Sequence, residues 1–71
     1  MKLHYDPETD SLYIDLNDRP SVDSREISDD VVLDVDADGQ PVGFDIQHAS
    51  RLLDLSFLET EALPARSVKM G

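Results

Sequence analysis

Residues 31–46 constrain the fold most strongly, because apolar and polar side chains alternate on both sides of Asp38-Gly39. The apolar members of the alternation are Val31, Leu33, Val35, Val42, Phe44 and Ile46. A period of two is typical of a strand with one buried face, and Asp-Gly favours a two-residue loop with positive φ. That loop would pair Val35 with Val42, Leu33 with Phe44 and Val31 with Ile46 on one face. The segment therefore predicts a hairpin over residues 31–47.

A second hairpin is predicted over residues 2–16. Leu3 and Tyr5 alternate with polar residues, and so do Leu12, Ile14 and Leu16. Between the two runs, Asp6-Pro7-Glu8-Thr9-Asp10 has the residues of a turn, because proline presets φ and aspartates accept local backbone hydrogen bonds. Arg25-Glu26-Ile27 suggests a short edge strand.

The spacing becomes helical after His48, where Ala49, Leu52, Leu53 and Phe57 fall on one helix face. Ser56 to Glu59 has the form of a capping box, so the helix is expected to break near residues 54–55 and restart before Pro64. The predicted fold is α+β: a small antiparallel sheet of four to five strands with a short C-terminal helix packed on one face. Residues 1–63 are expected to form a single domain, and 64–71 a mobile tail.

The charge is strongly acidic and uneven. The formal net charge is -10, and residues 1–50 hold 13 acidic and 3 basic side chains. Nucleic acids and anionic membranes attract basic surfaces, so neither is an expected partner, whereas a basic protein is. The chain has no cysteine and no long apolar run, and its first residues do not resemble a signal peptide, so a cytoplasmic location is expected.

The motif with the sharpest spacing is Asp34-x-Asp36-x-Asp38-Gly39, with Asp45 at the twelfth position. This spacing resembles a calcium-binding loop, in which alternate carboxylates and a final acidic residue surround the cation. Such loops lie between helices, whereas these aspartates lie between predicted strands. An Asp-Gly hairpin turn is the favoured interpretation, and a calcium site at these four residues is the alternative.

No pattern in the chain indicates an enzyme or a cofactor. His4 and His48 are 44 positions apart, no serine lies in a nucleophile-elbow pattern, and no glycine-rich loop could hold a phosphate. His4 is expected on the solvent side of its strand and His48 at the junction between strand and helix. We therefore expect neither catalytic residues nor a cofactor.

Exposed apolar residues are the remaining candidates for function. Outward-facing positions on the strands and surplus apolar positions near the C-terminus predict a protein-binding surface: Tyr13, Val32, Leu55, Phe57, Leu58 and Leu63. The expected function is a non-catalytic protein-interaction module. An open sheet also leaves edges and apolar area that self-association could cover.

Four segments resemble domain-of-unknown-function family 2283. They are Tyr5-Asp6-Pro7-Glu8-Thr9-Asp10-Ser11-Leu12-Tyr13-Ile14, then Val32 to Gly39 with Val42-Gly43-Phe44-Asp45-Ile46, and finally His48-Ala49-Ser50. The resemblance covers residues 2–53 and implies a small sheet fold, with a structural role for the hairpin aspartates. It supplies no catalytic or binding residues. Members encoded beside small RelE-like toxins suggest an antitoxin role.

Overall fold

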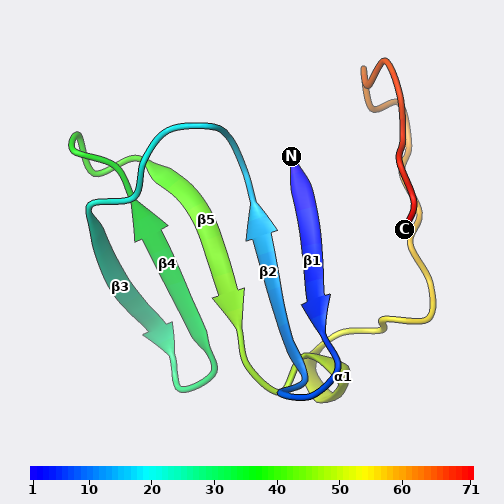
Figure 1. Cartoon of the computed structure of the whole chain (residues 1–71), viewed down its shortest axis with the longest axis horizontal. Coiled ribbons are helices and arrows are strands. Elements are labelled where there is room, and N and C mark those ends of the chain that lie inside the picture. The colour runs from blue at the N-terminus through cyan, green and yellow to red at the C-terminus, as the bar shows by residue number, and fades with distance from the viewer.

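The chain forms an antiparallel five-stranded sheet in the order β1-β2-β5-β4-β3, which a computed structural model describes over residues 1–71 (Figure 1). The elements are β1 (Lys2–Asp6), β2 (Ser11–Asp15), β3 (Asp23–Ser28), β4 (Val31–Val35), β5 (Pro41–Ile46) and α1 (Ala49–Leu52). Both predicted hairpins are confirmed, and β2 pairs with β5 to join them. The segment around Ile27 is the predicted edge strand, β3.

The strand register separates the two faces of the sheet by chemistry. One face, here called the apolar face, carries Leu3, Tyr5, Leu12, Ile14, Val31, Leu33, Phe44 and Ile46. The opposite face, here called the acidic face, carries Asp6, Asp15, Glu26, Asp34 and Asp45, with Lys2 as its basic residue. Side chains alternate along each strand, so this separation follows directly from the period of two in the sequence.

The loop between β4 and β5 is longer than the predicted two-residue turn. Leu33 pairs with Phe44 and Val31 with Ile46 as expected, but a register shift after Asp34 places Val35 opposite Pro41. Gly39 has the expected positive φ of 79°. The predicted Val35–Val42 pair is therefore wrong, because residues 36–40 form a wider turn around the Asp36 carboxylate.

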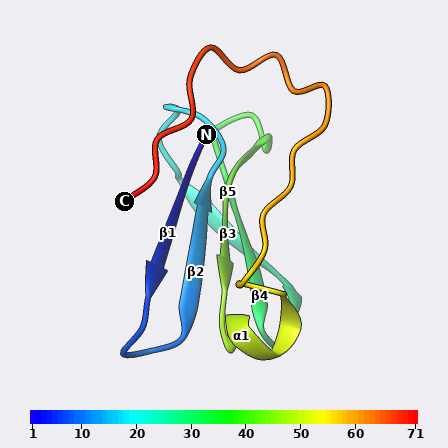
Figure 2. The same cartoon turned by 90° about the vertical axis from the view of Figure 1, so that its right-hand side faces the viewer.

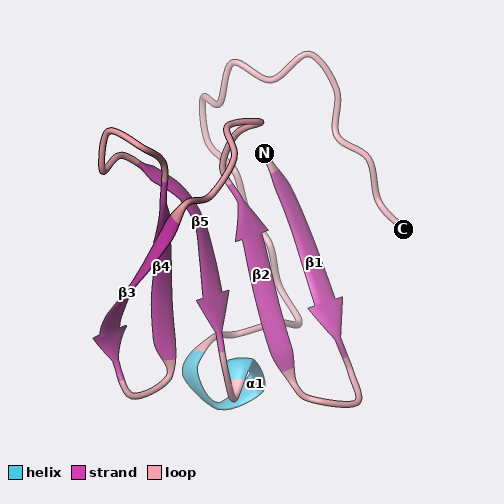
Figure 3. Cartoon of the chain, turned by 60° about the vertical axis from the view of Figure 1, so that its left-hand side comes forward, coloured by secondary structure: helices cyan, strands magenta, loops and turns pink.

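The core lies where the apolar face meets α1. Leu12, Ile46 and Ala49 form a buried cluster, and Ile14, Val31 and Phe44 pack against it. Ala49 is fully buried, and its backbone N–H donates to the Asp10 carbonyl at 2.9 Å. Figure 3 shows α1 at the end of the sheet where the β1–β2 turn lies. The helix therefore covers one end of the apolar face.

The helix is a single turn, so the predicted restart before Pro64 is wrong. His48, with φ of 53°, precedes α1, and the backbone becomes extended at Leu53. Asp54 then accepts hydrogen bonds from the backbone N–H of Ser56, at 3.1 Å, and from its hydroxyl. Ser56 is thus bonded backward to Asp54 instead of capping a second helix, a local bond that competes with helix formation.

Residues 54–71, here called the C-terminal segment, run apart from the sheet. The chain leaves α1, passes beyond the β1 edge and turns back alongside it (Figures 1 and 2). The radius of gyration is 13.1 Å, whereas a compact chain of this length would have about 11 Å. No helix in the structure is long and apolar enough to span a bilayer.

Tyr13 crosses Gly43 on the acidic face and bonds β2 to β4 across β5. Its hydroxyl donates to Asp34 at 2.9 Å, and a Cβ atom added at Gly43 would lie 2.6 Å from the ring carbon that bears this hydroxyl. Burial, followed by the hydrogen bond to Asp34, raises the pKa of Tyr13 to about 12. Glycine at position 43 therefore leaves the space that the Tyr13 ring occupies.

We expect Gly43→Ala to destabilise the fold by about 2 kcal/mol, because the new methyl group displaces Tyr13 and breaks a hydrogen bond to a charged acceptor. Urea unfolding followed by circular dichroism measures the cost. The same substitution should cost less in a Tyr13→Phe background, where the hydroxyl and its bond are already absent. If the destabilisation caused by Gly43→Ala is the same in the wild-type and Tyr13→Phe backgrounds, the proposed contact between position 43 and Tyr13 is contradicted.

Candidate functional site

The C-terminal segment exposes large apolar side chains along its whole length. Their exposed fractions are Leu55 42%, Phe57 67%, Leu58 64%, Leu63 52%, Val68 70% and Met70 79%. The segment makes no backbone–backbone hydrogen bond, and its only side-chain bonds join Asp54 to Ser56. No ion pair links it to the sheet. Its predicted binding residues, Leu55, Phe57, Leu58 and Leu63, are therefore accessible.

An open groove separates this segment from the β1–β2 end of the sheet. Leu3, Tyr5, Leu12 and Ile14 line its sheet side. Apolar residues of the C-terminal segment line the other side, among them Phe57, Leu58 and Leu63. The groove thus lies between two apolar surfaces.

The two other predicted binding residues lie on the opposite face of the sheet. Tyr13 and Val32 both stand beside Asp45 on the acidic face, and both are half-buried. The hydroxyl of Tyr13 is occupied by Asp34, which also accepts a hydrogen bond from Ser24 at 2.7 Å. The structure therefore does not bring Tyr13 and Val32 together with the apolar residues of the C-terminal segment.

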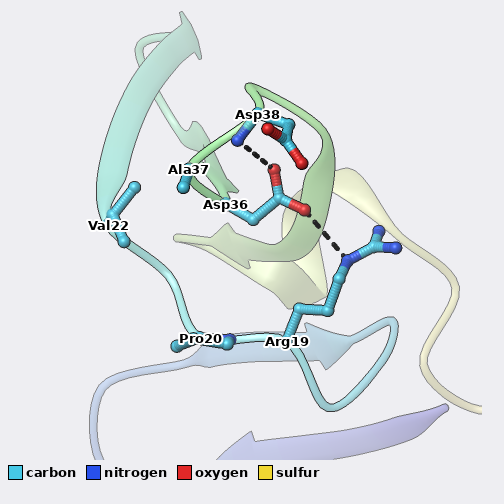
Figure 4. Close-up of a pocket in the computed structure, with 6 residues that line it drawn as sticks. All are labelled: Arg19, Pro20, Val22, Asp36, Ala37 and Asp38. Carbon is cyan, nitrogen blue, oxygen red and sulfur yellow. Dashed lines mark hydrogen bonds and ion pairs between the residues drawn. The ribbon is translucent and has the colours of Figure 1, made fainter.

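Asp36 is the buried carboxylate that organises the β4–β5 loop. It is 8% exposed, and its Oδ1 atom accepts hydrogen bonds from the backbone N–H groups of Asp38 and Gln40, each at 2.9 Å. Its Oδ2 atom lies 3.0 Å from Nε of Arg19. Figure 4 shows the contacts of Asp36 with Asp38 and Arg19 beside a small pocket lined also by Pro20, Val22 and Ala37. The bonds of Asp36 thus hold the β4–β5 loop together and attach it to the connection between β2 and β3, where Arg19 lies.

Three of the four aspartates of the calcium-like motif have separate side-chain partners. Asp34 bonds Tyr13 and Ser24, Asp36 bonds Arg19 and the loop backbone, and Asp45 accepts a bond from Gln47. Asp38 is exposed. No group of three His, Asp or Glu side chains in the structure is arranged to hold a metal ion.

A polar cluster around Asp10 joins the first hairpin to α1. The Asp10 carboxylate accepts hydrogen bonds from the Ser50 hydroxyl and the Tyr5 hydroxyl, each at 2.7 Å, and from the Ser50 backbone N–H at 3.1 Å. These bonds, that of Tyr5 first, lower the pKa of Asp10, and the carboxylate in turn raises the pKa of Tyr5. We call this cluster the Asp10 clasp.

A second polar cluster, around Asp30, bonds the β3–β4 turn to the α1 region. Nδ1 of His48 lies 2.9 Å from Asp30, and a terminal nitrogen of Arg51 lies 3.5 Å from the other oxygen of the same carboxylate. The hydrogen bond with His48 is the main reason that the pKa of Asp30 is lowered. The backbone N–H of Gln47 also donates to the Asp30 carbonyl at 2.7 Å. Both turns at this end of the sheet are thus bonded to the α1 region.

Neither cluster has the arrangement of an activated nucleophile. The Ser50 hydroxyl donates to Asp10 and not to a histidine, and His48 is engaged by Asp30. His4 is exposed on β1, as expected. No local pattern in the sequence marks Asp10, Asp30 and Ser50 as interacting residues, because the bonded pairs are 40 and 18 positions apart. Positive φ at Asp10 and His48, each 53°, is also not evident from the sequence.

Comparison with protein families places this chain. The profile of DUF2283, described as a protein of unknown function, matches residues 2–50. The chain belongs to the DUF2283 family. No curated protein and no solved structure matches it. The part shared with DUF2283 spans the sheet and ends at Ser50 of the Asp10 clasp, so the C-terminal segment lies outside the match.

Acid should weaken the fold of this DUF2283 protein through Asp10 and Asp30. Both carboxyls have folded pKa values below the ordinary 3.8, so they stabilise the fold above that pH, and the contribution is lost as the pH falls through their folded pKa. We expect the melting temperature to drop below pH 3.8, and Asp10→Asn to reduce that drop, because asparagine tolerates positive φ but does not titrate.

Thermal unfolding followed by circular dichroism across this pH range measures the effect. The matched control is Asp18→Asn, which removes the same charge from an exposed residue that makes no side-chain hydrogen bond. Identical pH profiles for the two variants would contradict the role of the Asp10 clasp.

Proposed function

We propose that this DUF2283 protein is a non-catalytic protein-interaction module that binds a basic protein partner through its C-terminal segment. One observation carries the proposal: large apolar side chains, 42% to 79% exposed, lie along a segment that no hydrogen bond or ion pair attaches to the sheet. Exposed apolar residues of this size supply binding energy when a partner buries them. Leu55, Phe57, Leu58 and Leu63 are the proposed anchors.

Charge supplies the preference for a basic partner. The chain has a net charge of -10, and five acidic side chains share the acidic face with one lysine. A surface of one sign accelerates the approach of a partner of the other sign, and salt screens this attraction. The acidic face therefore steers the encounter, while the C-terminal segment provides the contact.

An antitoxin is the specific form of this proposal. In that form the partner is a small basic ribonuclease-like toxin, as the family resemblance suggests, and the C-terminal segment wraps the toxin surface. Segments that order upon binding can cover a large area of a partner, which suits inhibition of an enzyme. The proposal rests on the exposed segment and on the charge of the sheet.

A pull-down from native cytosol tests the proposal with the full chain as bait. We expect a small basic protein in stoichiometric amount, and we expect Phe57→Ser with Leu58→Ser to lose it. The matched control is Val68→Ser with Met70→Ser, which removes equally exposed apolar side chains of the same segment outside the proposed anchors.

The rate of association with that partner should fall at least tenfold between about 50 mM and about 500 mM salt, because screening removes the electrostatic steering. Surface plasmon resonance with the purified partner gives this rate. An empty eluate, or equal capture by both double variants, would contradict the proposal; a salt-independent rate would contradict its electrostatic part.

Calcium binding through Asp34, Asp36, Asp38 and Asp45 is the alternative function. Because Asp34, Asp36 and Asp45 have separate partners and Asp38 is exposed, we expect calorimetry with calcium to give only weak heats, with dissociation constants of roughly 1 mM. Asp38→Ala and Asp18→Ala should change these heats equally, since each removes one exposed carboxylate. Calcium binding with a micromolar dissociation constant that is lost in Asp38→Ala but not in Asp18→Ala would favour the calcium alternative.

A further inference from the structure

The apolar face is only partly covered by its own chain. Leu3 is 46% exposed and Tyr5 39% exposed, while Ile14, Leu33 and Phe44 are half-buried. The buried apolar core consists of Leu12, Val35, Val42, Ile46 and Ala49. The core of a chain of this length rarely supplies much stability on its own, and disulfides, a metal or association commonly add to it. This chain has no cysteine.

We propose that a second copy of this chain packs on the apolar face, so that two sheets form a sandwich. This contact differs from that of the proposed hetero-partner, which uses the C-terminal segment. That segment faces Leu3 and Ile14 across the open groove, and it has to move aside for the second copy to dock, since no hydrogen bond or ion pair attaches it to the sheet. The two copies would bury Leu3, Ile14, Leu33 and Phe44 against each other. Sheets that pack in this way lie about 10 Å apart with interdigitated side chains.

The distribution of charge favours a second copy as the occupant. On β1, β2, β4 and β5 the apolar face carries no charged residue, and at the β3 edge Asp23 and Arg25 have opposite charges. Packing through this face leaves both acidic faces pointing outward. Two sheet layers then separate the acidic side chains by more than the Debye length of about 10 Å. Two chains of charge -10 can therefore meet on this face, whereas a basic partner gains no charge pairing there.

The size of the face sets the strength of the dimer. Five strands spaced at about 4.8 Å, each about 17 Å long, give a face of roughly 350 Å² in projection. The accessible area of standing side chains exceeds their projection, but α1 covers one end of the face, so two copies bury at most on the order of 1,000 Å², at the lower end for specific interfaces. Interfaces of this size are typical of weak, reversible complexes, and we expect a dissociation constant in the micromolar range.

Sedimentation equilibrium of the full chain tests the proposal. Between about 5 µM and about 500 µM, the average mass should rise from near 7.9 kDa toward twice that value. Leu3→Lys should weaken the dimer at least tenfold, because it places a charge in the apolar interface. His4→Lys is the matched control, since it adds the same charge at the neighbouring exposed residue, on the acidic face.

Salt and the C-terminal segment separate this proposal from the hetero-partner. Added salt should strengthen the dimer, since it screens repulsion between two acidic chains, whereas it should slow association with a basic partner. Phe57→Ser with Leu58→Ser should leave the dimer intact. A wild-type chain that stays monomeric at the highest concentration overturns the proposal. Equal weakening of the dimer by Leu3→Lys and His4→Lys also overturns it. If the Phe57 and Leu58 substitutions dissociate the dimer, the contact belongs to the C-terminal segment instead.

Discussion

The Asp10 clasp is the interaction on which the arrangement of this small fold depends. A helix of one turn has no stability of its own, because helix nucleation is unfavourable and few hydrogen bonds repay it. The clasp removes that difficulty by bonding Ser50 to the turn of the first hairpin. Ala49, the neighbour of Ser50, packs in the buried cluster with Leu12 and Ile46. Together with the bonds of Asp30 to His48 and Arg51, the clasp keeps α1 over the end of the apolar face that forms the core.

The separation of the two sheet faces explains how so acidic a chain can hold a core. Alternation places Asp15, Asp34 and Asp45 together on one face, and the opposite face remains free of charge across four strands. Acidic side chains on a solvated face are screened, so their repulsion costs little where no apolar burial is needed. The same separation gives the molecule two different surfaces, one suited to electrostatic attraction and the other to apolar contact.

The sequence predicted those features that depend on local periodicity. Alternation between residues 31 and 46 was enough to assign the strands and the faces, because a period of two leaves little choice of register. The width of the β4–β5 loop could not be predicted in this way. Its shape follows from Asp36, whose carboxylate draws the N–H groups of Asp38 and Gln40 around itself, and an Asp-Gly pair alone does not reveal that bonding.

The Asp10 clasp and the end of the helix escaped the sequence analysis for the same reason. Asp10 and Ser50 meet only in the folded chain, across 40 positions, and no local pattern marks them. Helical spacing from Ala49 to Phe57 predicted a longer helix, but Asp54 captures the N–H and hydroxyl of Ser56 and the backbone leaves the helix. Pattern-based prediction weighs apolar spacing, whereas here one local hydrogen-bonding side chain decided the outcome.

The boundary of the family match falls between the sheet and the exposed C-terminal segment. Residues 2–50 contain the sheet and the complete Asp10 clasp, whereas the exposed apolar side chains of the C-terminal segment follow that boundary. Contacts through the apolar face would therefore be tied to folding, since the same side chains that join two copies also extend the core of each. Contacts through the C-terminal segment involve no core residue, so a partner can gain or lose them without unfolding the sheet. On the two proposals made above, this chain would gain stability from the first kind of contact and the ability to exchange partners from the second.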